Sequence, residues 1–288
     1  MAPTPPAFRD KADADGSGLT VPPPSLPREA VSHTIGRLQA GYRRDVPWAV
    51  AAVARLRREA GRNAYTSPTA WGLDHLETLS ELREERRVTE REGRDGGSAA
   101  PAYFSSEAHV GQEERERRED TAVHIAVTLW ALHQQSLRDE PMHLAGWSLG
   151  RAVRRLAHGR TGVRDSGATA DGTGANPVAD PVEDAGETVR RRFVRIGAAS
   201  DTDVLATRLR EMVLLLRSAR IPLDYALLAD QLLRWQDENR RDDVRRIWGR
   251  DFHRRHGLPG PDRGGSGSDE ADTDAVPAED LDVADLDS

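Results

Sequence analysis

The chain has 288 residues, enough for one large or two small domains, and its 41 basic and 48 acidic residues give a formal charge of −7. The absence of cysteine excludes a disulfide framework, a Cys-ligated zinc site and a thiol nucleophile. No run approaches the roughly 18 apolar residues of a membrane span, and prolines replace the apolar core of a signal peptide, so we expect a cytoplasmic protein with no membrane partner.

Acidic residues are concentrated in two segments that contain neither Lys nor Arg. Nine acids fall in residues 269–288 and six in residues 165–187, and without these fifteen acids the rest of the chain carries a formal charge of +8. Low apolar content predicts that residues 1–27 are a disordered arm, 161–187 a flexible acidic insertion and 257–288 a disordered acidic tail. The foldable part of the chain is therefore basic.

The two remaining segments, 28–160 and 188–256, have the apolar periodicity of helices and predict an all-α fold of two small helical bundles. In chain order, helices are expected around residues 31–38, 45–56, 68–82, 114–136, 148–156, 189–196, 205–216, 222–235 and 244–248. The helix around 205–216 follows a capping-box pattern at Ser200–Asp203. Four tryptophans lie on apolar stripes and are predicted to be core residues: Trp71, Trp130, Trp235 and Trp248.

The sequence Gly146-Trp-Ser148-Leu-Gly150 matches the G-x-S-x-G motif of serine hydrolases. That motif requires a buried strand that leads the serine into a sharp turn before a helix. The preceding residues are too short and irregular for a strand, and Ser148 stands directly before an amphipathic helical run. We therefore interpret Ser148 as a helix N-cap and expect no catalytic residue.

The nine histidines form no recognisable metal-ligand pattern. His124 and His133 are nine positions apart and do not share a helix face, so both are predicted to be ordinary core or polar residues. We expect neither a metal site nor a cofactor, and the chain is not predicted to be an enzyme.

Arginines gather on two predicted helices. In the helix that follows Ser148, a step of about 100° per residue places Arg151, Arg154 and Arg155 opposite the apolar side chains. In the helix that follows the insertion, Arg191 and Arg195 stand opposite an apolar stripe, and Arg190 and Arg192 flank them. By contrast, 81–94 and 113–120 mix both signs closely, which is typical of a solvated helix or loop.

The arginine faces suit phosphate, because a guanidinium group is a planar fork of hydrogen-bond donors. Since the tryptophans are assigned to the core, binding is expected to involve the nucleic-acid backbone and to show little sequence preference. A basic face alone is weak evidence for such binding, because most charged faces are simply solvated.

Several sequence pieces occur in an order that resembles the CasB family. They are Leu38-Gln-Ala-Gly-Tyr42, Leu56-Arg-Arg58, Leu129-Trp-Ala-Leu-His-Gln-Gln135, Ser148-Leu-Gly-Arg-Ala152, Arg190-Arg-Arg-Phe193, Leu223-Asp-Tyr225, Leu232-Leu-Arg-Trp-Gln236 and Val244–Phe252. The resemblance covers about 30–160 and 188–252, and it rests on the number and order of the pieces. The insertion departs from the family pattern because it separates the two basic segments more widely.

The resemblance implies an α-helical, non-catalytic small subunit of the type I-E CRISPR Cascade complex, present as a pair of copies. Its partners would be the other Cascade subunits with CRISPR RNA, a second copy of itself, and target DNA, especially the displaced strand of the R-loop. By matching position, the nucleic-acid-binding residues would be Arg151, Arg190, Arg191 and Arg192. Arg154, Arg155 and Arg195 rest on helical geometry alone, and Arg58 comes from an upstream piece.

Two other classes of protein stay open. A purely structural helical adaptor would use the same arginines to contact acidic protein surfaces, without nucleic acid. A helix-turn-helix regulator would need base-reading side chains at the start of its recognition helix. The helix after Ser148 offers Leu149 and Gly150 there instead.

Overall fold

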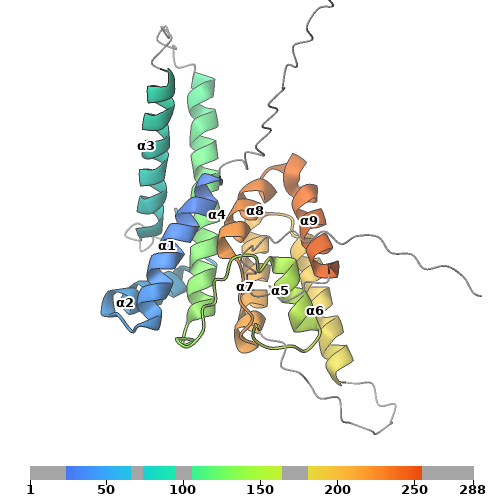
Figure 1. Ribbon diagram of the computed structural model, residues 1–288. Coiled ribbons are helices and arrows are strands. Elements are labelled where there is room, and N and C mark those ends of the chain that lie inside the picture. The colour runs from blue at the N-terminus through green and yellow to red at the C-terminus, as the bar shows by residue number, and fades with distance from the viewer. Residues whose placement is uncertain (1–23, 66–73, 95–105, 164–180, 255–288) are drawn as a thin grey trace, which may run out of the picture. The chain divides into compact units, whose positions relative to one another are not determined.

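A computed structural model describes residues 24–65, 74–94, 106–163 and 181–254. The helices are α1 Leu26–Arg43, α2 Pro47–Glu59, α3 Asp74–Arg94, α4 Ser106–Gln134, α5 Leu149–Ala157, α6 Pro181–Gly197, α7 Thr202–Ser218, α8 Tyr225–Trp235 and α9 Glu238–His253 (Figure 1). Within these ranges there is no strand, only one isolated β-bridge between His143 and Leu223. The predicted all-α fold class is confirmed.

The second half of α4 forms the centre of the core. Every residue from Ala122 to Gln134 is buried, because α1, α2, α7 and α8 all pack against this helix (Figure 1). One continuous cluster of buried apolar residues extends from Leu26 in α1 to Trp248 in α9. The two predicted bundles thus share one core, and α8 joins them by packing on both α1 and α4.

The predicted core tryptophans can be compared with the structure at three positions. Trp130 and Trp235 are fully buried and Trp248 is 2% exposed, which confirms the prediction for these residues. Trp71, like the predicted helix start at Pro68, lies outside the described residues. None of the helices in the described ranges combines the length and the apolar character needed to cross a membrane.

Side-chain caps explain where several helices begin. Ser148 is the N-cap of α5, as predicted, and its Oγ accepts the backbone N–H of Arg151 at 3.4 Å. At α7 the expected cap at Ser200 is replaced by Asp201, whose Oδ1 accepts the N–H of Val204 at 2.8 Å. The hydroxyl of Ser200 instead donates to the Asp201 carboxylate at 2.7 Å, because a carboxylate is the better acceptor.

Several predicted boundaries differ from the structure: α3, α4 and α9 are longer than expected, and local contacts explain three other differences. α1 begins at Leu26, within the predicted arm, because Ser25 caps it. α6 begins at Pro181, within the predicted insertion, and Gly186 lets it approach α5 so closely that a Cβ there would lie 2.6 Å from the Ala157 carbonyl oxygen. α8 begins at Tyr225 rather than Pro222, since the Leu223 N–H donates to the carbonyl of Met142 before Asp224 caps the helix.

Most of the low-apolar segments lie outside the described residues. These are 1–23 of the predicted arm, 164–180 of the predicted insertion and all of the predicted tail at 257–288. The first residues of the predicted insertion are ordered: the Gly162 N–H donates to the Ala219 carbonyl at 2.9 Å.

Buried histidines make the fold sensitive to acid. His75 lies 3.1 Å from the ring of His124, and burial followed by the charge of His124 lowers the pKa of His75 to about 3. His133 bonds the Tyr225 hydroxyl at 2.8 Å, and burial lowers its pKa to about 3 as well. Burial also lowers the pKa of His124 and His143. All four rings are therefore neutral in the folded protein at pH 7.

We expect the free energy of unfolding to fall when the pH drops from 7 to 5. The unfolded histidines take up protons below pH about 6.5, whereas the folded ones do not, so acid favours the unfolded state by about 2 kcal/mol for each strongly shifted histidine. Urea unfolding at the two pH values measures the change. A free energy that stays constant between pH 7 and pH 5 would show that these rings are not held neutral.

Candidate nucleic-acid interface

The three predicted arginines of α5 are partly buried. The guanidinium group of Arg151 lies over the ring of Trp147, 4.2 Å from its centroid, and its Nη1 donates to the Gly146 carbonyl at 3.2 Å. Burial, followed by the adjacent charge of Arg155, lowers the pKa of Arg151. Arg155 also faces Trp147, at 5.9 Å. Trp147 thus holds two like charges close together.

The other two side chains of this set bind backbone carbonyls. Arg154 Nη1 donates to the carbonyls of Phe252 at 3.0 Å and His253 at 3.4 Å, which are the last residues of α9. Arg155 Nε donates to Gly162 at 2.5 Å and its Nη2 to Thr161 at 3.1 Å. The predicted arginine face of α5 is therefore partly covered, because α9 and the 161–162 turn pack beside α5 and provide acceptors.

The predicted arginines of α6 are more exposed. Arg191 pairs with Glu187 one turn earlier at 3.1 Å, and Arg192 lies 3.9 Å from Glu211 of α7. Arg190 and Arg195 are exposed, and neither side chain contacts a carboxylate among the described residues. Surface pairs of this kind are worth about 0–1 kcal/mol, so the α6 arginines remain accessible to another anion.

The structure brings the two predicted basic segments together. Arg154 of α5 donates to the end of α9, and Arg190 of α6 lines a groove with the same two residues, Phe252 and His253. Among the described residues, no carboxylate pairs with Arg151, Arg154 or Arg190. The arginine-containing helices α5 and α6, which precede and follow residues 164–180 in the chain, therefore each bring an arginine to the C-terminal end of α9.

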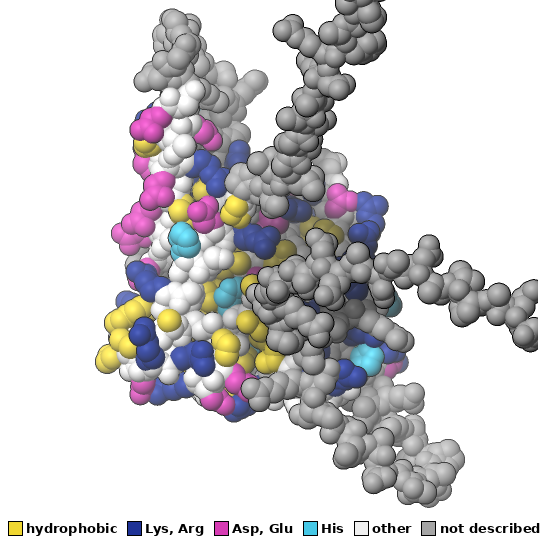
Figure 2. All heavy atoms as spheres, in the orientation of Figure 1, with side chains coloured by type: hydrophobic (Ala, Val, Ile, Leu, Met, Phe, Trp, Pro, Cys, Tyr) yellow, Lys and Arg dark blue, Asp and Glu magenta, His cyan; other side chains and the backbone are white. Residues whose placement is uncertain are grey.

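Arg58 lies elsewhere, near the end of α2, and is exposed. The turn that follows contains Gly61, where a Cβ would lie 3.5 Å from the Arg210 side chain of α7, and Arg62, which is 3.6 Å from Glu59. The turn after Arg58 thus lies beside α7, and no contact in the described part of the chain joins Arg58 to the arginines of α5 and α6. Sequence reasoning missed Arg210, although it occupies the exposed side of a helix whose apolar stripe was identified. In the view of Figure 2, basic side chains are frequent around α2, whereas acidic ones gather along α3.

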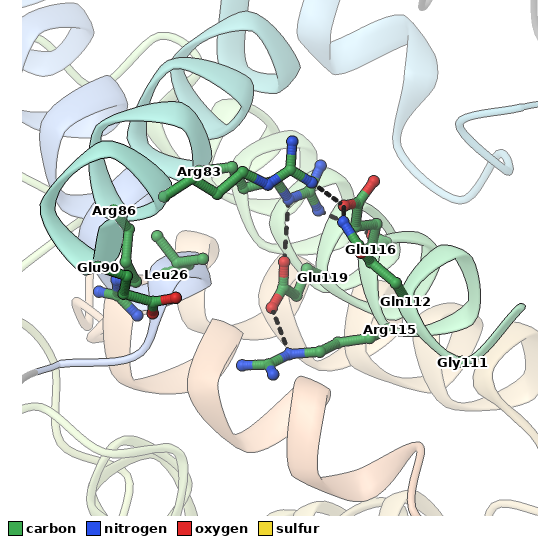
Figure 3. Close-up of a pocket in the computed structure, with 10 residues that line it drawn as sticks. Leu26, Arg83, Arg86, Glu90, Gly111, Gln112, Arg115, Glu116 and Glu119 are labelled. Atoms are coloured by element: carbon green, nitrogen blue, oxygen red, sulfur yellow. Dashed lines mark hydrogen bonds and ion pairs between the residues drawn. The ribbon is translucent and has the colours of Figure 1, made fainter. Parts of the chain in front are cut away.

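A second charged feature is a cavity of about 450 Å³ between α3 and α4. Figure 3 shows Arg83 and Arg115 directed at Glu119, which accepts from them at 3.0 and 3.3 Å. Two further arginines of its lining also have acidic partners, Arg86 with Glu29 and Arg87 with Glu116. Because the cations are balanced by carboxylates, this cavity is a structural ion-pair network and not a site for an anion.

The same network corrects an expectation from the sequence. The mixed-charge segments 81–94 and 113–120 were predicted to be solvated, yet the Arg83 and Glu119 side chains are only 11% and 4% exposed. Their charges face one another across two helices, and Arg83 also pairs with Asp120 at 2.8 Å. No group of three or more His, Cys, Asp or Glu in the part of the chain that the structure describes is arranged to hold a metal ion.

Comparison with known proteins places this arrangement in a family. The family model for CRISPR-associated protein Cse2 matches residues 52–253, a range that includes the arginines of both α5 and α6. The chain belongs to the Cse2 family. The resemblance to CasB proteins in the sequence is thereby confirmed.

One solved structure of a similar protein supports this assignment. CasB from Thermobifida fusca is 35% identical, and the match covers 81% of this chain and 100% of that chain with a TM-score of 0.54. A CRISPR-associated protein of the Cse2 family from Thermus thermophilus is 22% identical, over 79% of this chain and 97% of that chain, with a TM-score of 0.44. No curated protein sequence matches the chain. The Cse2 assignment thus rests on the family model and the Thermobifida structure.

Proposed function

We propose that this Cse2-family chain is a non-catalytic small subunit of a type I-E CRISPR Cascade complex and binds the nucleic-acid backbone through arginines of α5 and α6. In that complex the guide RNA reads sequence by base pairing, while protein supplies charge along the backbone. The chain would act there with the other Cascade subunits, CRISPR RNA and a second copy of itself. It would stabilise the R-loop by holding the displaced DNA strand.

The observation that supports this proposal most strongly is that Arg154 and Arg190 both lie beside Phe252 and His253 at the end of α9. Among the described residues, no carboxylate pairs with either arginine. Guanidinium groups that lie beside the same helix end can contact neighbouring phosphates of one polyanion. A guanidinium group has five N–H donors, so the carbonyl bonds of Arg154 Nη1 leave donors for a phosphate oxygen. Arg191, Arg192 and Arg195 extend the charge along α6.

A structural adaptor is the second candidate. It is favoured by the carbonyl contacts of Arg151, Arg154 and Arg155, which show that these side chains already hold α5, α9 and the following turn in place. An adaptor would need no nucleic acid. The two candidates differ in whether the exposed arginines of α6 bind DNA.

We expect the triple variant Arg190→Ala, Arg191→Ala, Arg195→Ala to bind single-stranded DNA at least about tenfold more weakly than the wild-type chain, because three accessible cations are removed. Fluorescence anisotropy at low salt measures the affinity, with unrelated DNA sequences as probes. Helical circular dichroism should be unchanged, since exposed arginines contribute little to stability and alanine favours helix.

A matched control removes the same amount of charge elsewhere. Arg240 and Arg246 are exposed and Arg118 is partly exposed, and each pairs with an acid on its own helix or cap. Their triple replacement by Ala changes the net charge equally. This control should bind DNA within about twofold of wild type. Equal affinities for wild type, control and α6 variant would favour the adaptor.

A further inference from the structure

An apolar groove lies between α6 and α9. Both helices pack on α5 (Figure 1). The groove between them is a cavity of about 350 Å³. The described residues that line it are Arg190, Phe193, Val194, Gly197, Arg245, Trp248, Gly249, Phe252 and His253. Gly197 and Gly249 contribute to its width, because a Cβ at either position would meet nothing within 4 Å.

The apolar walls of this α6–α9 groove are unusually exposed. Val194 is 69% exposed, the highest value for a large hydrophobic side chain in the described ranges. The rings of Phe193 and Phe252 stack on each other at 5.3 Å and are only partly buried, while Trp248 forms part of the buried floor. Exposed apolar surface bordered by polar groups is typical of a binding site for another molecule.

Charge at the groove has one sign. The charged or titratable side chains that line it are Arg190, Arg245 and His253, and no Asp or Glu belongs to the lining. Arg245 is held in place, since its Nε donates to the Gly197 carbonyl at 2.7 Å and its Nη1 pairs with Asp242 at 2.8 Å. Arg190 is exposed and contacts no carboxylate in the described part of the chain. An occupant with carboxylates would therefore be favoured.

We propose that the α6–α9 groove binds an acidic, amphipathic segment of another protein. Its apolar side chains would enter between Val194, Phe252 and the floor at Trp248, and its carboxylates would pair with Arg190 and Arg245. Arginine and aromatic residues are enriched at the centres of protein interfaces, and an amphipathic helix in a groove is a recurrent mode of recognition. Nucleic acid fits less well, because the floor is apolar and the two phenylalanine rings stack on each other rather than offering free faces.

The test uses the full-length chain and a fluorescent synthetic helical peptide with leucines on one face and glutamates on the other. We expect saturable binding of this peptide. Two altered peptides, with every Leu replaced by Ala or every Glu replaced by Lys, should bind at least about tenfold more weakly. Equal binding of all three peptides, or binding of none, would overturn the proposal.

Protein variants locate the binding. Val194→Asp introduces a repelling carboxylate at an exposed position, so the fold should survive and binding of the acidic peptide should fall by at least about tenfold. Val110→Asp on α4 is the matched control, because Val110 is 60% exposed and does not line the groove. If Val194→Asp and Val110→Asp bind the peptide equally, with circular dichroism unchanged in both, the groove is not the site.

Other occupants give distinct results, and each would overturn the proposal. A loss of single-stranded DNA affinity in the neutral variant Val194→Ser would make nucleic acid the occupant, because phosphate contacts through Arg190 do not need that apolar side chain. If the chain associates with itself and Val194→Asp abolishes that association, the occupant of the groove is a second copy of the chain. If the peptide binds markedly more tightly after the nine acids of 269–288 are changed to Asn and Gln, the occupant of the groove is the chain's own tail.

Discussion

Replacing Gly150 by Ala should destabilise the protein by about 3 kcal/mol, although alanine is the better helix former. Gly150 lies in α5 where that helix crosses α9, and a Cβ there would meet the backbone of α9 at less than 3 Å: the Trp248 carbonyl oxygen and, at 2.6 Å, the Phe252 nitrogen. Backbone cannot rotate away as a flexible side chain can. The two helices must therefore separate, which weakens the apolar packing between them.

Gly36 provides the control for that substitution. It also lies within a helix, α1, but a Cβ there meets nothing within 4 Å. Gly36→Ala should be neutral or stabilising by up to about 1 kcal/mol. Urea unfolding of both variants measures the difference, and a Gly150→Ala protein as stable as Gly36→Ala would show that α5 and α9 are not packed this closely.

Removal of the Arg83 side chain should cost about 3 kcal/mol. In the variant Arg83→Met, the apolar stem is largely kept but the buried Glu119 loses its bond at 3.0 Å and Asp120 its bond at 2.8 Å. Glu119 would then be left with Arg115 alone, at 3.3 Å, as its cationic partner. A buried carboxylate without its main partner is much more costly than an exposed one.

The neighbouring Arg87 shows the contrast. It pairs with Glu116 in the same cavity, but its side chain is 42% exposed. Arg87→Met should therefore cost less than about 1 kcal/mol. Chemical denaturation of the two variants compares them directly. Equal losses of stability would contradict the distinction between a buried network at Glu119 and a solvated pair at Glu116.

The sequence predicts best the features that depend on a single helix, such as its apolar stripe and its N-cap. The stripe of Leu149, Ala152 and Val153 is buried and Ser148 caps the helix, as periodicity and the N-cap rule predict. Position around one helix does not reveal what packs beside it. Arg154 stands opposite the stripe as expected, yet its guanidinium group binds the end of α9, which is 98 residues distant in sequence.

Pairing between helices was also hidden from the sequence. Arg83 and Glu119 are 36 residues apart and both lie in mixed-charge segments, where local pattern favours solvation. Only the packing of α3 on α4 removes them from water. The start of α6 was assigned to the flexible insertion because this segment has few apolar residues. Its close packing at Gly186 against Ala157 depends on the position of α5, which the local sequence does not reveal.

The salt dependence of DNA binding tests the central claim most directly. If exposed arginines neutralise phosphates, the logarithm of the binding constant of the wild-type chain should fall linearly with the logarithm of the salt concentration, with similar slopes for unrelated single-stranded sequences. Removal of Arg190, Arg191 and Arg195 should flatten that slope by up to about 0.7 for each phosphate that the protein no longer neutralises. A slope and affinity identical to wild type, in a variant that remains folded, would contradict nucleic-acid binding through α6.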